Sequence, residues 1–387
     1  MRIAAFSLIF ASIVAFGLAA PARAQLATPA EYALIMDAES GAVLFEKNAD
    51  TPTSPASMSK LMTIAIVFER LKTGETRLDD EFFVSERAWR EREGSSMWVR
   101  VNTKIRVEDL LRGVIVQSGN DACIVLAENI AGTEEAFAEL MTRKAREWGM
   151  NNSTFANSHG LPHPDHKMSM RDLALLARKI IVDFPEYYPM FAEREFTWEK
   201  IRQPNRNPLF DMVDGADGLK TGHTEESGYG LVGSATQGGE RRIIVVNGLG
   251  SERERAQESA RLMRVAFNDF TRKTIYKAGD IVGDASVFKG AAPSTPLIVR
   301  EPVSLLMHRS LVDKIDAKVV YQGPVPAPVS ENQQIGYLRI ETGGDAREYP
   351  LFAGRPVREL GVFGKIGLAV RTLIAKPAGD APAEATP

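Results

Sequence analysis

The sequence contains very little cysteine. Cys123 is the single cysteine in 387 residues, which excludes an intramolecular disulfide framework and a zinc site built from several cysteines. Charge of one sign is lacking too, because 47 basic and 50 acidic residues leave a net charge of −3, and this balance gives no support to nucleic acid as a partner. What is present is an ordinary globular composition, 44% hydrophobic and 25% charged, over a length sufficient for two domains or more.

Long hydrophobic runs are lacking except at the N-terminus. There, Arg2 precedes an apolar run from Ile3 to Ala20, and Pro21-Ala22-Arg23-Ala24 follows it. A short basic start, an apolar core and an A-x-A site are typical of a secretory signal peptide, which we place at residues 1–24. The A-x-A site disfavours the alternative, a transmembrane anchor. We therefore expect an exported protein.

Strand patterns lie at both ends of the segment 25–272, and helical patterns lie between them. Residues 32–37 and 42–46 flank the expected hairpin turn Glu39-Ser40-Gly41, and residues 228–235 and 242–248 predict two further strands. Helical periodicity is found at residues 108–116, 121–130, 134–148, 170–182 and 252–270. Strands from both ends must pair in one antiparallel sheet, so we expect an α+β domain that cannot be divided in its middle.

The character of the chain changes from about Lys277. Short β-like pieces alternate with glycine and proline turns, which predicts a small all-β domain at residues 273–356.

Residues 357–376 place apolar side chains on one face and basic ones around them, as in a helix that lies in a membrane interface. The alternative is a helix packed on its own domain; its three glycines indicate that it needs some partner to form. Residues 377–387 are small and polar, and we expect a disordered tail.

A serine and a lysine lie three residues apart at the start of a predicted buried helix. Pro55 and Ala56 suit a helix entry, then come Ser57 and Lys60, and an apolar run follows. On a helix, residues three apart share one face. A serine is a poor nucleophile until a base takes its proton, and a neutral amine one turn away can do so. This spacing is frequent by chance, so the pair alone decides nothing.

Two further short motifs change this assessment. Ser118-Gly119-Asn120 lies in a loop between two expected helices, and Lys220-Thr221-Gly222 leads a strand-rich stretch. The three motifs form the set found in β-lactamases and penicillin-binding proteins. Each is weak alone. Together, in this order and on an exported chain, they indicate a serine acyl-transfer enzyme.

With these motifs the chain resembles the low-molecular-mass penicillin-binding proteins, the serine-type D-alanyl-D-alanine carboxypeptidases. The resemblance runs from about Tyr32 to Val357 and includes Gly94-Ser95-Ser96-Met97, residues 149–155 and Asn205-Arg206-Asn207. It implies a β-lactamase-like transpeptidase domain, with an antiparallel sheet and a helical subdomain, followed by the all-β domain. It also implies a C-terminal membrane anchor and a place on the periplasmic side of the cytoplasmic membrane. The implied partners are peptidoglycan stem peptides, β-lactams and a membrane surface, with no cofactor.

The resemblance assigns roles in the chemistry to five residues. Ser57 is the acylated nucleophile, and Lys60 is its base, with a pKa depressed by burial and by the nearby Lys220. Ser118 and Asn120 relay the proton to the leaving amine and hold the substrate amide. Backbone N–H groups of Ser57 and His223 form the oxyanion hole.

The resemblance also implies a carboxylate-binding site. Lys220, Thr221 and, on the helix at 252–270, Arg255 hold the terminal carboxylate of the substrate, with Gly222 and His223 following in the same strand. An arginine offers a paired-donor fork for a carboxylate. Two alternatives stay open: Arg253 has this role instead, or Arg255 simply lies on a solvated face of the helix.

Other conspicuous residues receive plainer interpretations. Cys123 lacks a basic partner in the sequence, and we expect a small buried hydrophobic residue. His159, His163 and His166 cluster, but Gly160 and two prolines interrupt them and exclude a helical HExxH geometry. We therefore expect no metal site, and a structural or substrate-edge use of this loop.

The predicted function is removal of the terminal D-Ala from stem pentapeptides through an acyl-enzyme on Ser57, with β-lactams as covalent inhibitors. A DD-endopeptidase uses identical chemistry and stays open. A serine β-lactamase needs efficient deacylation, often by a glutamate, and Glu128, Glu134 and Glu135 offer no convincing candidate. A non-catalytic wall-binding protein predicts damaged motifs, whereas all three are intact here.

Overall fold

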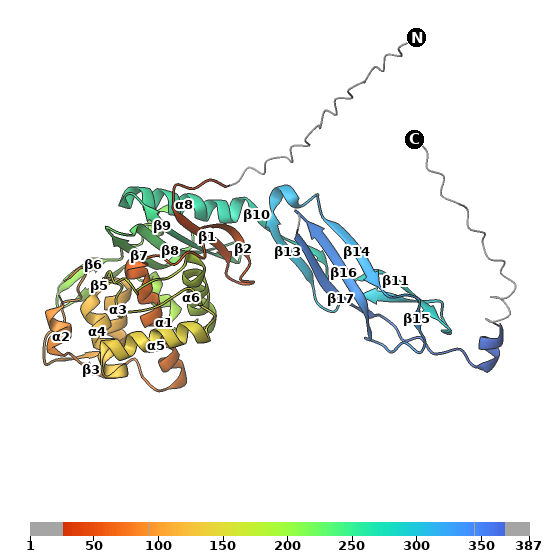
Figure 1. The fold of residues 1–387 in the computed structure, drawn as a ribbon, viewed down its shortest axis with the longest axis horizontal. Coiled ribbons are helices and arrows are strands. Elements are labelled where there is room, and N and C mark those ends of the chain that lie inside the picture. The colour runs from red at the N-terminus through yellow and green to blue at the C-terminus, as the bar shows by residue number, and fades with distance from the viewer. Residues whose placement is uncertain (1–25, 92, 344, 368–387) are drawn as a thin grey trace, which may run out of the picture.

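The computed structural model describes residues 26–91, 93–343 and 345–367. They form a larger unit, in which helices surround a sheet, and an elongated unit made of strands (Figure 1). The α+β fold with a following all-β unit is confirmed. The domain boundaries at residues 272 and 356 stay predictions.

A five-stranded antiparallel sheet forms the centre of the larger unit, in the order β2-β1-β9-β8-β7. Its strands are β1 (Tyr32–Asp37), β2 (Val43–Lys47), β7 (Ala216–Thr224), β8 (Gly228–Gln237) and β9 (Glu240–Leu249). β1 pairs with β9, with Leu34 opposite Val245. The sheet therefore joins the two ends of the segment, as the strand patterns predict.

Both faces of this sheet are covered by helices. Leu34 of β1 belongs to the core shared with α1 (Lys60–Thr73) and α6 (Met170–Asp183). The next residue, Ile35, packs in the core shared with α8 (Glu252–Asn268). Because successive side chains of a strand point to opposite faces, β1, β8 and β9 each contribute buried residues to both cores. The sheet is thus the middle layer of three (Figure 1).

The remaining helices lie in sequence between β2 and β7. They are α2 (Glu86–Arg90), α3 (Val107–Ile115), α4 (Asn120–Ala131), α5 (Glu134–Glu147) and α7 (Leu209–Met212), with 3₁₀ turns η1 (Ala56–Ser59) and η2 (Tyr188–Ala192). Two short hairpins accompany them: β3 (Glu81–Phe83) with β4 (Lys104–Arg106), and β5 (Glu195–Trp198) with β6 (Ile201–Pro204). The five helices expected from periodicity end within about two residues of the observed ones, as such patterns allow.

The turn that carries Ser57 differs from the expectation. Ser57 lies in the 3₁₀ turn η1, and α1 begins only at Lys60. Ala56 has a φ of +49°, which an α-helix does not accommodate. In a 3₁₀ turn the side chains at i and i+3 eclipse, so Ser57 and Lys60 still share one face.

The elongated unit has two sheets around one core. A six-stranded sheet has the order β14-β16-β17-β12-β11-β15, and β10 pairs with β13. The strands are β10 (Phe270–Tyr276), β11 (Ile281–Phe288), β12 (Ser294–Ile298), β13 (Val303–His308), β14 (Asp316–Tyr321), β15 (Val325–Pro326), β16 (Gln334–Thr342) and β17 (Asp345–Ala353), and the turn η3 (Arg309–Leu311) follows β13. Leu297, Leu338 and Leu351 are among its buried residues.

Buried charges join the two units. Asp37, at the end of β1, accepts hydrogen bonds from Arg242 Nη1 at 2.6 Å and from Arg272 Nη2 at 2.9 Å. Arg242 belongs to the central sheet, whereas Arg272 belongs to β10. The carboxylate is almost fully buried, so breaking either contact leaves a costly unpaired charge.

Both ends of the chain carry predictions that the structure covers only in part. The signal peptide (1–24) and the tail (377–387) lie outside the described residues. Of the segment 357–376, the structure describes the part to residue 367, with a helix at 362–367 on which Val362, Phe363 and Ile366 are exposed. Among the described residues, no helix is long and apolar enough to cross a membrane.

Candidate active site

Ser57 and Lys60 are held together by the geometry of η1. Lys60 Nζ donates a hydrogen bond to Ser57 Oγ at 2.8 Å. The neighbouring Ala56 is buried in a left-handed backbone conformation that residues with a Cβ rarely adopt. Such strain is tolerated where the surroundings fix it, and it clusters at functional sites.

Lys60 is a buried amine. Its side chain is fully enclosed, and Nζ donates a second hydrogen bond to the backbone carbonyl of His159. Burial lowers the pKa of Lys60 to about 8, with a further decrease from the Arg206 cation and partial opposition from Cys123 and Asp121. At neutral pH a usable fraction of this amine is therefore unprotonated and can accept the proton of Ser57.

The second motif lies at the start of α4. Ser118 is buried with a φ of +62°, and Asn120 is the first residue of the helix. Asn120 Nδ2 donates to the carbonyl of Glu93 at 2.7 Å, whereas its buried Oδ1 has no hydrogen-bond partner among the described residues. Buried polar atoms are normally paired, so this oxygen is available for a donor on a ligand.

The third motif lies on β7, at the edge of the central sheet and beside the nucleophile turn. A Cβ on Gly222 would come within 3.0 Å of the Pro55 carbonyl and 3.2 Å of Ala56 Cβ. Glycine thus permits β7 to lie against η1. Lys220 and Thr221 are buried beside it. Burial lowers the pKa of Lys220 well below its usual value, and repulsion from Lys60 lowers it further.

A cation that was not expected in this role, Arg206, lowers the pKa of Lys60 in addition to burial. Repulsion between Lys60 and Lys220 lowers the pKa of Lys220. Because repulsion between two like charges is mutual, it disfavours a proton on Lys60 as well, and this is the effect predicted for Lys220.

Arg255 reaches the same region from the first turns of α8. Its guanidinium lies 5.7 Å from the ring centroid of Tyr229, and the His223 ring stacks on Tyr229 at 3.9 Å. Arg255 Nη2 donates to Glu252 at 2.8 Å, while its buried Nε has no hydrogen-bond partner in the described part of the chain. His223 is exposed and Thr221 is buried, so the end of β7 leads from the interior to the surface.

The sequence predicts no role for Arg206. It belongs to the quoted Asn205-Arg206-Asn207 segment, yet nothing in that segment predicts where the side chain lies. Arg206 Nη1 donates to Ser95 Oγ at 2.6 Å, and its charge lowers the pKa of both lysines of the site. The loop between α2 and β4 thus meets the cations of β7 and α8 through Arg206, and the combined field favours an anionic ligand.

Cys123, His159 and His166 are buried. Cys123 is fully buried, as expected, and burial raises the pKa of its thiol to about 12. His159 contacts Glu134, and the buried His166 ring packs edge-on against Phe155. The absence of a metal site stays a prediction.

Comparison with known proteins gives two family matches. Residues 19–250 match the model of the D-alanyl-D-alanine carboxypeptidases, and residues 270–359 match that of the C-terminal domain of penicillin-binding protein 5. The chain is 38% identical over 341 residues to the D-alanyl-D-alanine carboxypeptidase DacC of Escherichia coli, covering 86% of this chain and 85% of the relative. It is 35% identical to DacA of Haemophilus influenzae, covering 94% and 95%.

Solved structures agree with this assignment. The crystal structure of the D-alanyl-D-alanine carboxypeptidase DacD from Francisella tularensis superposes with a TM-score of 0.78 at 32% identity, covering 87% of this chain and 95% of that one. Penicillin-binding protein 5 from Haemophilus influenzae gives a TM-score of 0.72 at 35% identity, covering 85% and 98%. The likeness therefore extends over both units of the fold.

Proposed function

Because this chain belongs to the D-alanyl-D-alanine carboxypeptidase family, we propose that it removes the terminal D-Ala of peptidoglycan stem peptides with Ser57 as its nucleophile. The protein is a serine hydrolase of the penicillin-binding type. The observation that carries the assignment of Ser57 is the 2.8 Å contact with an amine whose pKa burial lowers to about 8.

Acylation begins when neutral Lys60 takes the proton of Ser57. The Ser57 oxygen attacks the carbonyl of the penultimate D-Ala and forms a tetrahedral oxyanion, which the backbone N–H groups of Ser57 and His223 stabilise. Removing one such donor typically costs about 2.7–4 kcal/mol. The amide bond then breaks, and the leaving amine of the terminal D-Ala receives a proton by way of Ser118.

Asn120 orients the substrate amide. Its Nδ2 is engaged by the carbonyl of Glu93, which fixes the side chain and leaves the buried Oδ1 to accept an N–H of the peptide. A buried acceptor without a partner costs free energy, which a bound ligand recovers. Substrate binding thereby completes the hydrogen bonding of the site.

A site that binds the terminal carboxylate of the substrate favours one reaction, the removal of a C-terminal residue. Lys220, Thr221 and Arg255 form this part of the site, and Nε of Arg255, which has no partner among the described residues, can donate to a carboxylate oxygen. Charge-assisted hydrogen bonds of this kind are about twice as strong as neutral ones. Hydrolysis of the Ser57 ester by water then releases the shortened peptide, and a β-lactam acylates the same oxygen.

Two alternative activities share this chemistry. A DD-endopeptidase cleaves cross-links instead of free ends, and the D-alanyl-D-alanine endopeptidase of Pseudomonas aeruginosa is 30% identical over 55% of this chain and 68% of its own. That likeness covers 55% of this chain, whereas the carboxypeptidase relatives DacC and DacA cover 86% and 94% of it. Digestion of cross-linked muropeptides and of monomeric pentapeptide side by side separates the two, and fast turnover of a chromogenic β-lactam would indicate a β-lactamase.

The test of the proposed function uses Ser57→Ala. Purified wild-type protein is expected to release D-Ala from a stem pentapeptide and to form a one-to-one adduct with labelled penicillin. Ser57→Ala should lose both activities while unfolding at an unchanged or higher temperature. A Ser57→Ala variant that still hydrolyses the peptide would contradict the assignment. It would point to a different catalytic group or to a wall-binding role.

We also propose that the chain is exported and that residues 357–376 rest on a membrane surface. The support is the apolar run before Pro21 and the exposed Val362, Phe363 and Ile366 on the described start of the last helix. Apolar side chains at this density are stabilised by an interface between headgroups and acyl chains. When anionic vesicles are sedimented, the mature chain should be found in the pellet with them. A variant truncated after residue 356 should stay in the supernatant.

A further inference from the structure

Glu134 is a buried carboxylate beside the active site that the proposed mechanism does not use. It is the first residue of α5, with 4% of its surface exposed. Burial alone would raise its pKa, but the hydrogen bonds from His159 and Ser158 outweigh this and lower the pKa below its usual value. The side chain therefore carries a full negative charge in the interior, which proteins avoid without a reason.

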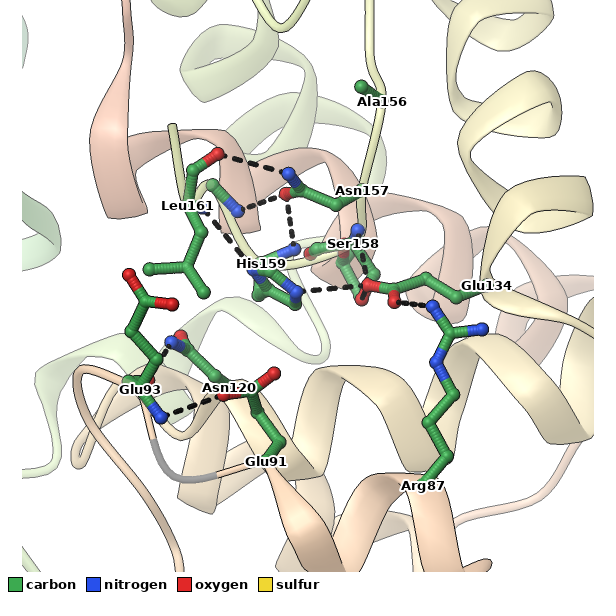
Figure 2. A network of polar contacts seen from close by, with 12 residues as sticks. Arg87, Glu91, Glu93, Asn120, Glu134, Ala156, Asn157, Ser158, His159 and Leu161 are labelled. Atoms are coloured by element: carbon green, nitrogen blue, oxygen red, sulfur yellow. Dashed lines mark hydrogen bonds and ion pairs between the residues drawn. The ribbon is translucent and has the colours of Figure 1, made fainter. Parts of the chain in front are cut away.

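Each oxygen of this carboxylate has a separate set of donors (Figure 2). Oε1 accepts from Ser158 N at 3.0 Å and from Ser158 Oγ at 2.6 Å, and His159 Nε2 lies 3.2 Å away. Oε2 accepts from Arg87 Nη2 of α2 at 2.7 Å. An amide in this place could not accept on both sides, because its NH₂ group would face either the Ser158–His159 donors or the guanidinium.

The loop 157–161, held by Oε1, is closed on itself. Asn157 Oδ1 accepts from Gly160 N at 2.7 Å, Asn157 Nδ2 donates to Leu161 O at 3.0 Å, and His159 Nδ1 accepts from Leu161 N at 3.2 Å. The His159 ring thus accepts at one nitrogen and faces Glu134 with the other (Figure 2). These hydrogen bonds tie the loop together, so fixing Ser158 and His159 fixes all of it.

The other side of this loop rests on the catalytic turn. The His159 carbonyl accepts a hydrogen bond from Lys60 Nζ, and the Ser158 carbonyl accepts one from Thr63 Oγ1 at 2.6 Å. A Cβ on Gly160 would lie 2.1 Å from the carbonyl of Ala56, so the loop is in direct contact with η1. Consecutive residues of one loop therefore face Glu134 on one side and the amine of Lys60 on the other.

We propose that Glu134 is a positioning residue for acylation, which sets the His159 carbonyl so that it holds Lys60 Nζ against Ser57 Oγ. The inference rests on the proposed roles of Ser57 and Lys60 and adds to them. A lysine has four rotatable side-chain bonds, and a neutral amine loses little when it rotates away from one partner. The His159 carbonyl is a second acceptor in a fixed place, and it keeps the Lys60 amine from rotating away from Ser57 before the substrate binds.

The expected size of the effect follows from this geometry. A misplacement of about 1 Å, caused by a change away from the reacting atoms, can cost about 100-fold in rate. Glu134→Gln is therefore expected to slow acylation by labelled penicillin by roughly 10- to 100-fold. The apparent binding constant before acylation should stay within about twofold, because the carboxylate site on β7 and α8 is untouched.

Glu135→Gln is the matched control. Glu135 is the next residue of α5 and pairs with the same Arg87 at 2.9 Å, but it is exposed and does not contact the loop 157–161 in the described structure. Its acylation rate should lie within about twofold of wild type, as is usual for an exposed ion pair. Glu134→Asp keeps the charge on a shorter side chain and should recover part of the rate lost in Glu134→Gln.

The experiment measures the rate constant and the final stoichiometry of labelling separately on the full mature chain. Positioning predicts slow labelling that still reaches one label per molecule in Glu134→Gln. Full stoichiometry at the wild-type rate would overturn the proposal, as would a lower stoichiometry with an unchanged rate, which indicates a purely structural role. If wild-type protein takes up no label, the proposed function itself fails, which is a distinct result.

A second variant covers the case in which Glu134→Gln does not fold. Ser158→Ala retains the carboxylate, the backbone donor and His159, and removes only the 2.6 Å hydroxyl contact. It is expected to slow acylation by roughly 3- to 10-fold, less than Glu134→Gln does, because one hydrogen bond to the charged group is lost and the others persist. Acylation at the wild-type rate in Ser158→Ala would then contradict the positioning role.

Discussion

The two units of this molecule differ most in what they bury. The larger unit encloses Lys60, Asn120, Lys220 and Arg242, whereas among the described residues after Ser259 the only buried polar residue is Thr295. Burying polar and charged groups costs stability unless each is paired. The larger unit tolerates this cost because its chemistry needs an amine of low basicity and free donors and acceptors in a dry site. The β unit has an ordinary apolar core.

The largest expected effect comes from removing the central buried charge. Lys60→Met should slow acylation by roughly 10³- to 10⁴-fold, because the proton of Ser57 loses its acceptor. It should also raise the free energy of unfolding at neutral pH by about 1–3 kcal/mol, because the folded state no longer carries an amine whose pKa is lowered from 10.5 to about 8. Penicillin labelling and urea unfolding measure the two.

The same substitution tests the pH dependence of stability. The unfolded chain binds more protons than the folded protein between pH 8 and 10.5, so wild type should gain stability as pH rises through this range. Lys60→Met should lose that gain. A variant that is less stable than wild type, or that gains equally with pH, would show that Lys60 is not a destabilising buried charge.

Arg255→Gln should have the next largest effect, confined to substrates with a free carboxylate. The KM for pentapeptide is expected to rise about 10- to 100-fold, as befits the loss of charge-assisted hydrogen bonds worth about 1.5–3 kcal/mol. A pentapeptide with an amidated C-terminus should be cleaved equally by both proteins. Arg253→Gln is the control on the same helix, and equal losses in both variants would point to a general charge effect.

The rate of acylation should increase with pH. Lys60 must be neutral to act as base, so the rate increases as pH rises through about 8. Between pH 7 and 9 we expect an increase of about 10-fold, followed by a plateau. Stopped-flow acylation in constant ionic strength measures this, and a rate that falls over the same interval would contradict a neutral-lysine mechanism.

The smallest effect on activity is expected in the β unit. Leu338→Ala and Leu34→Ala each remove a fully or nearly fully buried side chain, one from the β unit and one from the core shared with α1. Each should cost about 2–5 kcal/mol of local stability. Below the melting temperature only Leu34→Ala should slow acylation by more than about twofold, and equal slowing in both would show that the units are coupled.

The sequence indicates those parts of the site that rest on short motifs. Ser57 and Lys60 are three residues apart, so local periodicity already places them on one face, and Lys220 to His223 are neighbours in sequence on β7, so they stay close wherever that strand lies. Strand patterns at both ends similarly predict one antiparallel sheet built from distant segments, and the structure forms it by pairing β1 with β9.

Groups whose partners lie far along the chain escape such an analysis. Glu134 contacts Arg87 on one side and His159 on the other, and only the tertiary fold brings the three together. Arg206 stands in a quoted segment, but its effect on Lys60 depends on a loop and a strand from elsewhere. The left-handed Ala56, which turns the expected α-helix into η1, is likewise set by what packs against it.

The central claim is that Ser57 carries the acyl group. Full mature protein treated with penicillin and digested after acid quenching should yield one modified peptide, with the mass of one opened β-lactam on Ser57. Glu135→Gln should give the same peptide at the same rate. An adduct on Ser118 or Cys123, or a mass increase spread over several peptides, would contradict the account.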